Sequence, residues 1–362
     1  MTDVIVAVLL ANNYSIMVTD NIKGKRILLM CDKFYDYDEK IKNTLLHLGA
    51  KDVVLKNAKF FPGSFREKIS FKTFIFFIRN PFERSIWTNK LIKEINDKKF
   101  DIFLCIENMS FKKRFINYLK SNNPEIKTYL FLWDTFETQQ YRFRDYLPLF
   151  DYKLSFDRGD CKKYGLEYLP DFYLPLTHTS RIKYDLSFFG AMHPGETANR
   201  AELLHKINME CKRLGLNSYL YLKYTPISSK YKKWGKLLNY ILGYSSYNKV
   251  LKRYISEPYM HSEAVSTDVV DAVYSQSKVI LDISHPNRQG MTINCITALA
   301  SGKKLITTNK FVTQEPYYSP LNICVIDEST PRLDASFFCE HDFKVDMSYL
   351  RIDNWLKILL NR

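Results

Sequence analysis

Residues 277–309 contain a change of hydrophobic period that few folds accommodate. Residues 279–283 form an apolar run of strand length, and residues 285–290 are polar. From Met291 to Ala300 the apolar positions recur with helical spacing. Gly302 follows as a helix-ending glycine, and residues 305–308 form the next apolar run. A strand, a short helix and a strand make a βαβ unit, which indicates the open parallel sheet of an α/β fold.

The loop between that strand and that helix predicts an anion-binding site. Ligands of open parallel sheets bind where such a loop meets a helix N-terminus. Backbone N–H groups there, beside Arg288 and His285, suit a phosphate or a diphosphate. The pattern therefore predicts a nucleotide diphosphate as ligand, and an ordinary βαβ unit without a ligand is the alternative.

The same stretch resembles the donor-sugar segment of bacterial GT-B glycosyltransferases of the capsule, lipopolysaccharide and CgeB-like type. Gly290, Met291 and Thr292 align with the Gly-Leu-Thr of that family, and residues 302–309 align with its Gly-Lys-Lys-Leu-Ile-Thr-Thr-Asn. One departure is Thr297, where the family helix carries a Glu that commonly holds a ribose of the donor. The resemblance implies an α/β fold with two Rossmann-like domains that face each other across a cleft.

Other segments carry the resemblance into the rest of the chain. They are the loop at residues 32–37, the sequence LSFDRGDCKKYGL at residues 154–166, and DLSFFG at residues 185–190, which is followed on a helix by Arg200. The implied organisation is an acceptor-binding domain at residues 1–176 and a donor-binding domain at residues 177–340. Within the second domain, residues 219–256 are a basic, aromatic insert. Residues 341–362 form a C-terminal helix expected to pack back on the first domain.

Composition restricts the function classes. With 362 residues and 46% hydrophobic residues the chain can build two ordinary cores. Its seven cysteines are single and form no CxxC pair, which argues against a disulfide framework or a zinc site. No run of about twenty apolar residues occurs, so an integral membrane protein is not expected. The net charge of +14 calls for an anionic partner.

The insert has the composition of an interfacial amphipathic helix. Residues 219–254 contain many lysines and tyrosines and no Asp or Glu. The residues predicted to bind an anionic membrane are Lys232, Lys233, Trp234 and Lys236. A basic core helix with solvated lysines is the alternative.

The donor site is predicted to combine several segments. Its residues are Gly190, His193, Arg200, Tyr259, Met260, His285, Arg288, Gln289, Gly290, Met291, Thr292 and Lys304. Tyr259 and Met260 are included by resemblance alone, as contacts of the nucleotide base. Protein cations and a helix terminus can stabilise a leaving diphosphate, so neither a metal nor a cofactor is expected.

A carboxylate of the first domain is the predicted base if the reaction inverts the anomeric centre. Asp134 is preferred, because the resembling family also has Leu-Trp-Asp at this point. Asp32 is next, and Glu107 and Asp157 also follow predicted strands; His193 is a further candidate. Each acid is equally compatible with a local capping role. A retaining enzyme needs no such base.

Together these patterns predict a glycosyltransferase that moves a sugar from a nucleotide-sugar donor to a growing, lipid-linked bacterial surface polysaccharide, O-antigen or capsule. It would act in the cytoplasm, peripherally on the inner face of the cytoplasmic membrane. One alternative is another GT-B-shaped transferase acting on lipid-linked phosphorylated glycans. The other is a non-catalytic basic protein that binds nucleic acid or membranes, although no nucleic-acid-binding motif appears and no nucleic acid is expected as partner.

Overall fold

The computed structural model describes residues 21–33, 36–57, 76–107, 109–136, 141–177, 181–192, 199–224, 244–285, 288–339, 343 and 345–362. The chain divides into two compact units. The C-terminal unit is Asp171–Arg351, and the N-terminal unit comprises the described residues up to Pro170 together with Ile352–Arg362. The first boundary thus lies six residues before the predicted one at 176/177, and the final segment begins at residue 352 rather than at residue 341.

A six-stranded sheet forms the centre of the N-terminal unit, with the order β2-β1-β3-β4-β5-β6 and every pair parallel. Its strands are β1 (Arg26–Cys31), β2 (Asp52–Asn57), β3 (Ile102–Ile106), β4 (Lys127–Leu132), β5 (Tyr152–Ser155) and β6 (Glu167–Tyr168). Its helices are α2 (Tyr37–His47), α4 (Phe76–Ile95), α5 (Arg114–Asn122), η1 (Tyr141–Leu149), α7 (Arg158–Tyr164) and α13 (Ile352–Leu360). The central strands are buried on both faces, which is why they read as continuous apolar runs.

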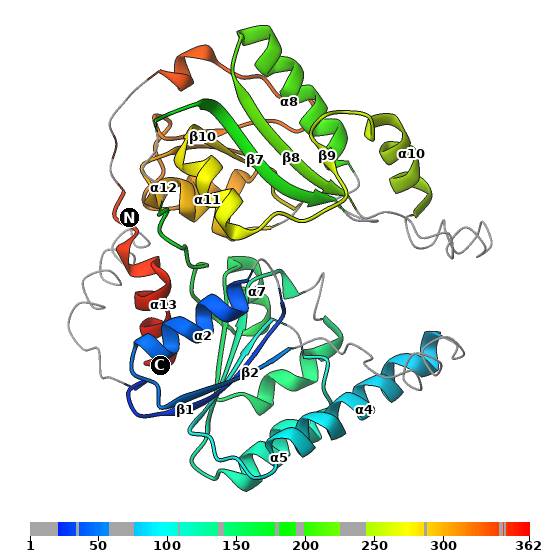
Figure 1. Ribbon diagram of the computed structural model, residues 1–362, viewed down its shortest axis with the longest axis vertical. Helices are drawn as coiled ribbons and strands as arrows, with labels where there is room; N and C mark the ends of the chain where they lie inside the picture. The colour runs from blue at the N-terminus through cyan, green and yellow to red at the C-terminus, as the bar shows by residue number, and fades with distance from the viewer. Residues whose placement is uncertain are drawn as a thin grey trace. The chain divides into compact units, whose positions relative to one another are not determined.

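Two pairs of helices cover this sheet (Figure 1): α4 lies beside α5, and α2 lies beside α13. Trp355 of α13 is fully buried, packs edge-on against Phe131 of β4 at 4.7 Å, and donates its indole N–H to Pro170 O at 2.9 Å. A buried aromatic side chain of this size contributes about 3–5 kcal/mol. The last helix of the chain therefore completes the core of the first unit.

A second six-stranded parallel sheet forms the centre of the C-terminal unit, with the order β12-β11-β10-β7-β8-β9. Its strands are β7 (Tyr184–Met192), β8 (Ser218–Tyr224), β9 (Met260–His261), β10 (Ser277–Asp282), β11 (Lys304–Thr307) and β12 (Ile323–Val325). Its helices are α8 (Arg200–Leu214), α10 (Tyr244–Tyr254), α11 (Thr267–Ser275), α12 (Ile293–Ala300), η3 (Lys310–Gln314), η4 (Ala335–Phe338) and η5 (Ser348–Leu350). Helices α8 and α10 share one hydrophobic cluster with the strands, whereas α11 and α12 contact β7, β10 and β11.

The fold class predicted from the sequence is confirmed: the protein is α/β, with two Rossmann-like units that each contain a parallel six-stranded sheet. One local prediction was wrong. Residues 219–224 are not part of an insert, because they form most of β8, which lies between β7 and β9 in the second sheet.

Candidate functional site

The strand order of each sheet defines where a ligand is expected to bind. In the C-terminal unit the order reverses between β7 and β10, which are hydrogen-bonded neighbours. Helices leave these two strands toward opposite faces, so the loops at their carboxyl ends diverge and leave room for a ligand. The predicted anion-binding loop follows β10 directly, so it lies at this topological switch point.

Asp282, the last residue of β10, organises the loop. Its buried carboxylate accepts hydrogen bonds from three hydroxyl groups, those of Ser284, Thr292 at 2.9 Å and Thr307 at 3.0 Å. These hydroxyls belong to the loop itself, to the start of α12 and to the end of β11. One carboxylate therefore fixes the loop, the helix terminus and the neighbouring strand relative to one another.

Residues that follow β11 also hold the loop. Thr308 Oγ1 accepts a hydrogen bond from Ser284 N–H at 3.0 Å, and the Asn309 side chain donates to Gly290 O at 2.9 Å. Asn309 is 3% exposed, so this bond is shielded from water. The Thr-Thr-Asn sequence thus has a structural role in shaping the Gly290 turn.

The structure brings six of the predicted donor residues together on this loop. They are His285, Arg288, Gln289, Gly290, Met291 and Thr292. Arg288 N–H donates to His285 O at 3.2 Å, which closes a turn. Gly290 and Met291 are buried, whereas His285, Arg288 and Gln289 are half-buried. The Thr292 hydroxyl caps α12 by accepting from Cys295 N–H at 3.3 Å.

Arg200 and Gly190 belong to the neighbouring strand and its helix. The Arg200 guanidinium donates to Ala191 O at 2.7 Å, close to the carboxyl end of β7. A Cβ atom on Gly190 would lie 2.4 Å from Cζ of Phe188, whose ring is buried in the core. Packing against Phe188 is therefore a sufficient reason for glycine at this position, independent of any ligand.

Three predicted donor residues lie elsewhere in the C-terminal unit. Lys304 is at the start of β11, so it lies at the amino ends of the strands and not at the carboxyl ends, where the loop is. Its ammonium group donates to the carbonyls of Phe337 and Cys339 at 2.8 Å each. Burial lowers the pKa of Lys304. Tyr259 and Met260 belong to the hydrophobic core beside the edge strand β9. His193 lies outside the described residues.

The N-terminal unit has its own switch point, between β1 and β3. Asp32 directly follows β1 and Glu107 directly follows β3, and both are buried. The pKa of the Cys105 thiol is raised mainly by burial and further by the charges of Asp32 and Glu107. Glu107 Oε2 also accepts from the N–H groups of Trp133 and Asp134, at 3.2 and 3.1 Å. The three predicted catalytic acids therefore lie at one edge of the sheet.

The structure also defines the surroundings of two other acids, Asp157 and Asp38. Asp157 caps α7 by accepting from Asp160 N–H at 3.0 Å, so its alternative as a capping residue holds. Asp38 is 7% exposed, and its Oδ1 has no hydrogen-bond partner in the described structure. Burial is the main cause that raises the pKa of Asp38. The spacing of Asp38, Ile41 and Leu45 on one helical face could have revealed this buried position.

The described part of the chain contains neither a candidate metal centre nor a helix that could span a membrane. No group of three His, Cys, Asp or Glu side chains there is arranged to hold a metal ion. Among the same residues no helix has both the length and the apolar character needed to span a bilayer. Lys232, Lys233, Trp234 and Lys236 lie outside the described residues.

No protein family matches the sequence, and no curated protein matches it. Solved structures do resemble it. The N-terminal domain of trehalose-6-phosphate phosphatase from Candida albicans superimposes with a TM-score of 0.52, covering 93% of this chain and 96% of that one at 11% identity. A UDP-forming α,α-trehalose-phosphate synthase from Burkholderia vietnamiensis has a TM-score of 0.47, with 8% identity and coverage of 78% and 84%. S. aureus MnaA with UDP also has a TM-score of 0.47, with 10% identity and coverage of 78% of each chain. At 11% identity, the first similarity shows a shared fold.

Proposed function

We propose that this protein is a GT-B glycosyltransferase that binds a nucleotide-sugar donor at the switch point of the C-terminal unit. The observation that carries the proposal is the position of the 285–292 loop. It follows β10 at the point where the strand order reverses, and it leads into the N-terminus of α12. Arg288 on this loop and Arg200 beside β7 bring positive charge to the same sheet edge.

These groups suit the departure of a nucleotide diphosphate. Cleavage of the bond to the sugar leaves negative charge on the diphosphate, which fixed cations and backbone N–H groups stabilise without reorganisation. Arg288 offers a planar guanidinium for paired hydrogen bonds to phosphate oxygens. His285 adds a ring nitrogen at the same loop. This set of groups can act without a metal ion.

The acids of the N-terminal unit suit the acceptor. In an inverting transfer a carboxylate takes the proton of the attacking hydroxyl group while the new glycosidic bond forms. Asp134 remains the preferred base, with Asp32 and Glu107 as alternatives and Asp38 added by its burial. Hydrogen bonds to Glu107 keep the loop that carries Asp134 beside the switch point of this sheet.

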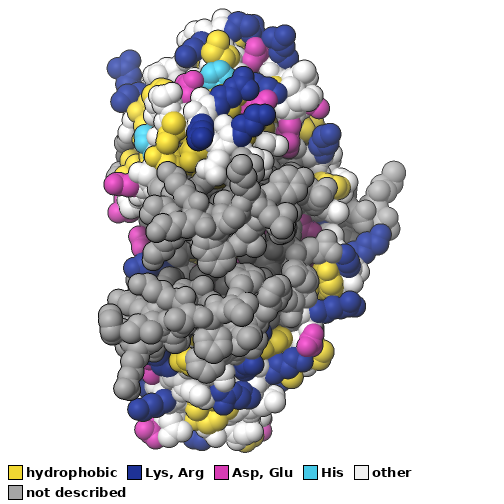
Figure 2. All heavy atoms as spheres, turned by 90° about the vertical axis from the view of Figure 1, so that its right-hand side faces the viewer, with side chains coloured by type: hydrophobic (Ala, Val, Ile, Leu, Met, Phe, Trp, Pro, Cys, Tyr) yellow, Lys and Arg dark blue, Asp and Glu magenta, His cyan; other side chains and the backbone are white. Residues whose placement is uncertain are grey.

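The acceptor in this proposal is a lipid-linked bacterial surface polysaccharide of the capsule or O-antigen kind. The protein would act peripherally on the inner face of the cytoplasmic membrane. The net charge of +14 supports attraction to an anionic surface, and Figure 2 shows Lys and Arg side chains interspersed with acidic and apolar ones over the described part of the face that it draws. Helix α10 contributes Lys249, Lys252 and Arg253 without any acidic residue.

A thermal-shift screen with nucleotides and nucleotide sugars tests the donor site. A ligand at about 100 times its Kd raises the unfolding midpoint by roughly 5 to 10 °C. Arg288→Ala should abolish this shift and leave the midpoint of the free protein unchanged. Arg181→Ala, which removes an exposed cation of the same unit, is the matched control and should keep the shift. An unchanged shift in Arg288→Ala would rule out this phosphate site.

A further inference from the structure

A second basic site lies in the N-terminal unit, and none of the predicted residues lines it. A surface pocket of about 410 Å³ is lined by Arg84, Lys112, Lys113, Arg114, Asp145 and Tyr146. Four of these side chains are cations and one is a carboxylate, which leaves a net charge of +3 (4 − 1). The residues come from α4, from the segment leading into α5 and the first residue of that helix, and from η1. A pocket with this charge is suited to an anion.

Neighbouring groups hold the two guanidinium groups in place. Arg84 donates through Nη2 to Phe111 O at 2.7 Å and to the hydroxyl of Tyr146. Arg114 donates through Nη2 to Asn89 Oδ1 at 2.6 Å and to Ser85 O at 3.2 Å. Side chains fixed in this way lose little further freedom when they bind a ligand, which favours affinity.

The carboxylate at the pocket leaves most of this charge uncompensated. Asp145 is at the rim, with a side chain that is 71% exposed, and it pairs with Lys113 at 2.9 Å. A hydrogen bond from Lys113 lowers the pKa of Asp145, so this carboxylate stays ionised at neutral pH. In the described structure the ammonium group of Lys112 has no hydrogen-bond or ion-pair partner, although its backbone N–H donates to Thr88 Oγ1. Lys112 is therefore available to a ligand.

The pocket also lies on the functional edge of its sheet. The segment that carries Lys112 and Lys113 begins at Glu107, directly after β3, and ends at the first turn of α5. Within the described chain no side chain caps α5, so the positive end of its dipole adds to the charge of the cations. One short segment thus connects Glu107, a predicted acceptor acid, to the pocket.

We propose that this pocket binds a phosphate or diphosphate group of the acceptor. The assignment of the ligand as the acceptor rests on the proposed function, whereas the anion site itself rests on the pocket alone. Arginine presents paired donors that match phosphate oxygens, and lysine supplies a point charge beside them. The acceptor would then be anchored by its phosphate end next to the acids that activate its hydroxyl group.

Titration calorimetry of the full chain with inorganic diphosphate tests the pocket. Lys112→Ala, and the double variant Lys112→Ala/Arg114→Ala, should weaken binding roughly tenfold or more, because charge-assisted hydrogen bonds are lost. The control, Lys40→Ala/Lys51→Ala, removes the same charge from exposed positions of the same unit and should bind as the wild type does. Equal weakening in both double variants, or none in either, would overturn the proposal. The single variant removes an unpaired ammonium group, so its fold is expected to stay intact.

Further experiments distinguish an acceptor phosphate from a lipid headgroup, and distinguish failure of the pocket from failure of the proposed function. Arg288→Ala is expected to remove diphosphate binding at the proposed donor loop alone, so the binding that remains in this variant should be weakened when Lys112→Ala is added. If no nucleotide shifts the unfolding midpoint while pocket binding persists, the proposed function fails and the anion site stands. Flotation with phosphatidylglycerol vesicles should not depend on Lys112. If Lys112→Ala loses vesicle binding but keeps diphosphate binding, the pocket serves lipid headgroups and the acceptor assignment is overturned.

Discussion

The carboxylate of Glu107 accepts a hydrogen bond from the backbone N–H of Asp134 at 3.1 Å, which joins the ends of two adjacent strands. Glu107 itself has a φ of 68°, a left-handed conformation that side chains other than glycine rarely adopt. Such a backbone is retained where the surroundings impose it, and these positions are common at functional sites. The hydrogen bond to Glu107 therefore fixes the backbone position of Asp134, the preferred base.

Replacing that base should separate chemistry from donor binding. Asp134→Asn is expected to lower the turnover of the nucleotide sugar by roughly 10²- to 10⁴-fold, because proton removal from the acceptor is lost. The nucleotide-induced shift in the unfolding midpoint should be unchanged. Glu125→Gln removes one exposed carboxylate from the same unit and serves as control. Turnover within a few-fold of wild type would transfer the role to Asp38, tested by Asp38→Asn.

Removing the Asp282 carboxylate should loosen the donor loop. Asp282→Ala leaves three buried or half-buried hydroxyl groups without this acceptor, and the free energy of unfolding should fall by about 2–3 kcal/mol. Urea denaturation measures the loss, and the nucleotide-induced shift should also disappear. Glu328→Ala, an exposed acid of the same unit, should change neither. A nucleotide shift that survives in Asp282→Ala would mean that the loop does not form the donor site.

Gly190→Ala distinguishes packing from ligand contact. The added methyl group meets the buried Phe188 ring, and the free energy of unfolding should fall by about 1–3 kcal/mol. Combining it with Phe188→Leu gives the methyl group space, so the two changes should cost less together than separately. Chemical denaturation of both single variants and the double variant measures this coupling. If the double variant is stable and still shifts with nucleotide, Gly190 is needed for packing alone.

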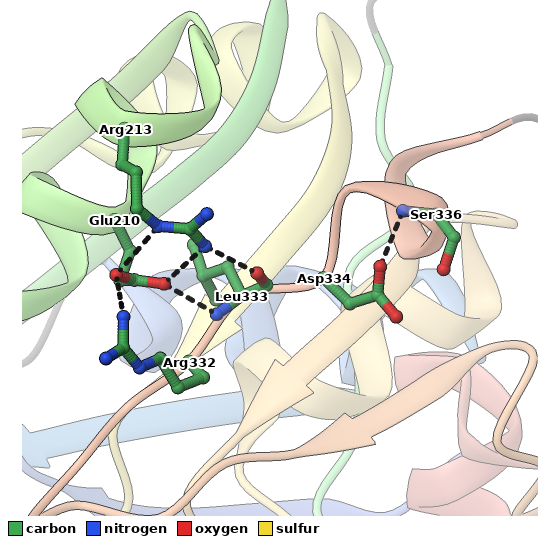
Figure 3. A network of polar contacts seen from close by, with 6 residues as sticks. All are labelled: Glu210, Arg213, Arg332, Leu333, Asp334 and Ser336. Carbon is green, nitrogen blue, oxygen red and sulfur yellow. Dashed lines mark hydrogen bonds and ion pairs between the residues drawn. The ribbon is translucent and has the colours of Figure 1, made fainter.

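Glu210 should make stability depend on acidic pH. Figure 3 shows its carboxylate accepting from Arg213, Arg332 and the N–H of Leu333, which ties the 332–338 segment to α8. Hydrogen bonding from Arg213 is the main cause that lowers the pKa of Glu210 to about 2, from an ordinary value of 4.5. A lowered folded pKa stabilises the protein above pH 4.5, and this contribution disappears as the pH falls from 4.5 to 2.

The measurement for Glu210 is urea denaturation at several pH values between 7 and 3. The wild type should lose more stability over this range than Glu210→Gln, because glutamine cannot be protonated there. Glu202→Gln, on the exposed side of the same helix, should keep the pH dependence of the wild type. Parallel curves for the wild type and Glu210→Gln would contradict the assigned ionisation.

Hydrophobic period was sufficient to predict the sheets, because the central strands are buried on both faces and appear as uninterrupted apolar runs. It failed where composition was unusual. Residues 219–224 alternate tyrosine and leucine, as a strand does, but the missing acids of the longer basic stretch suggested an insert instead. Lys304 was predicted to be a cation of the donor site, yet it begins β11 and therefore lies at the amino end of that strand, whereas the donor loop follows the carboxyl end of β10.

The site was predictable to the extent that topology fixes it. Loops at the carboxyl ends of neighbouring parallel strands must lie close together, so Asp32, Glu107 and Asp134 could be grouped before any coordinates were known. The hydrogen-bonding role of Asp282 could not, because its three partners are two, ten and 25 residues away and meet only after folding. The basic pocket was missed for the same reason, since Arg84 and Lys112 are far apart in the sequence.

The position of Trp355 has a consequence for protein synthesis. Its ring packs against the sheet built by residues before 171, yet Trp355 is translated only after the whole of Asp171–Arg351. In a nascent chain that has not reached residue 352, the first Rossmann unit therefore has an exposed apolar face, whereas the second unit can already fold. Ribosome stalling late in the message would leave an aggregation-prone, chaperone-dependent intermediate rather than one folded half.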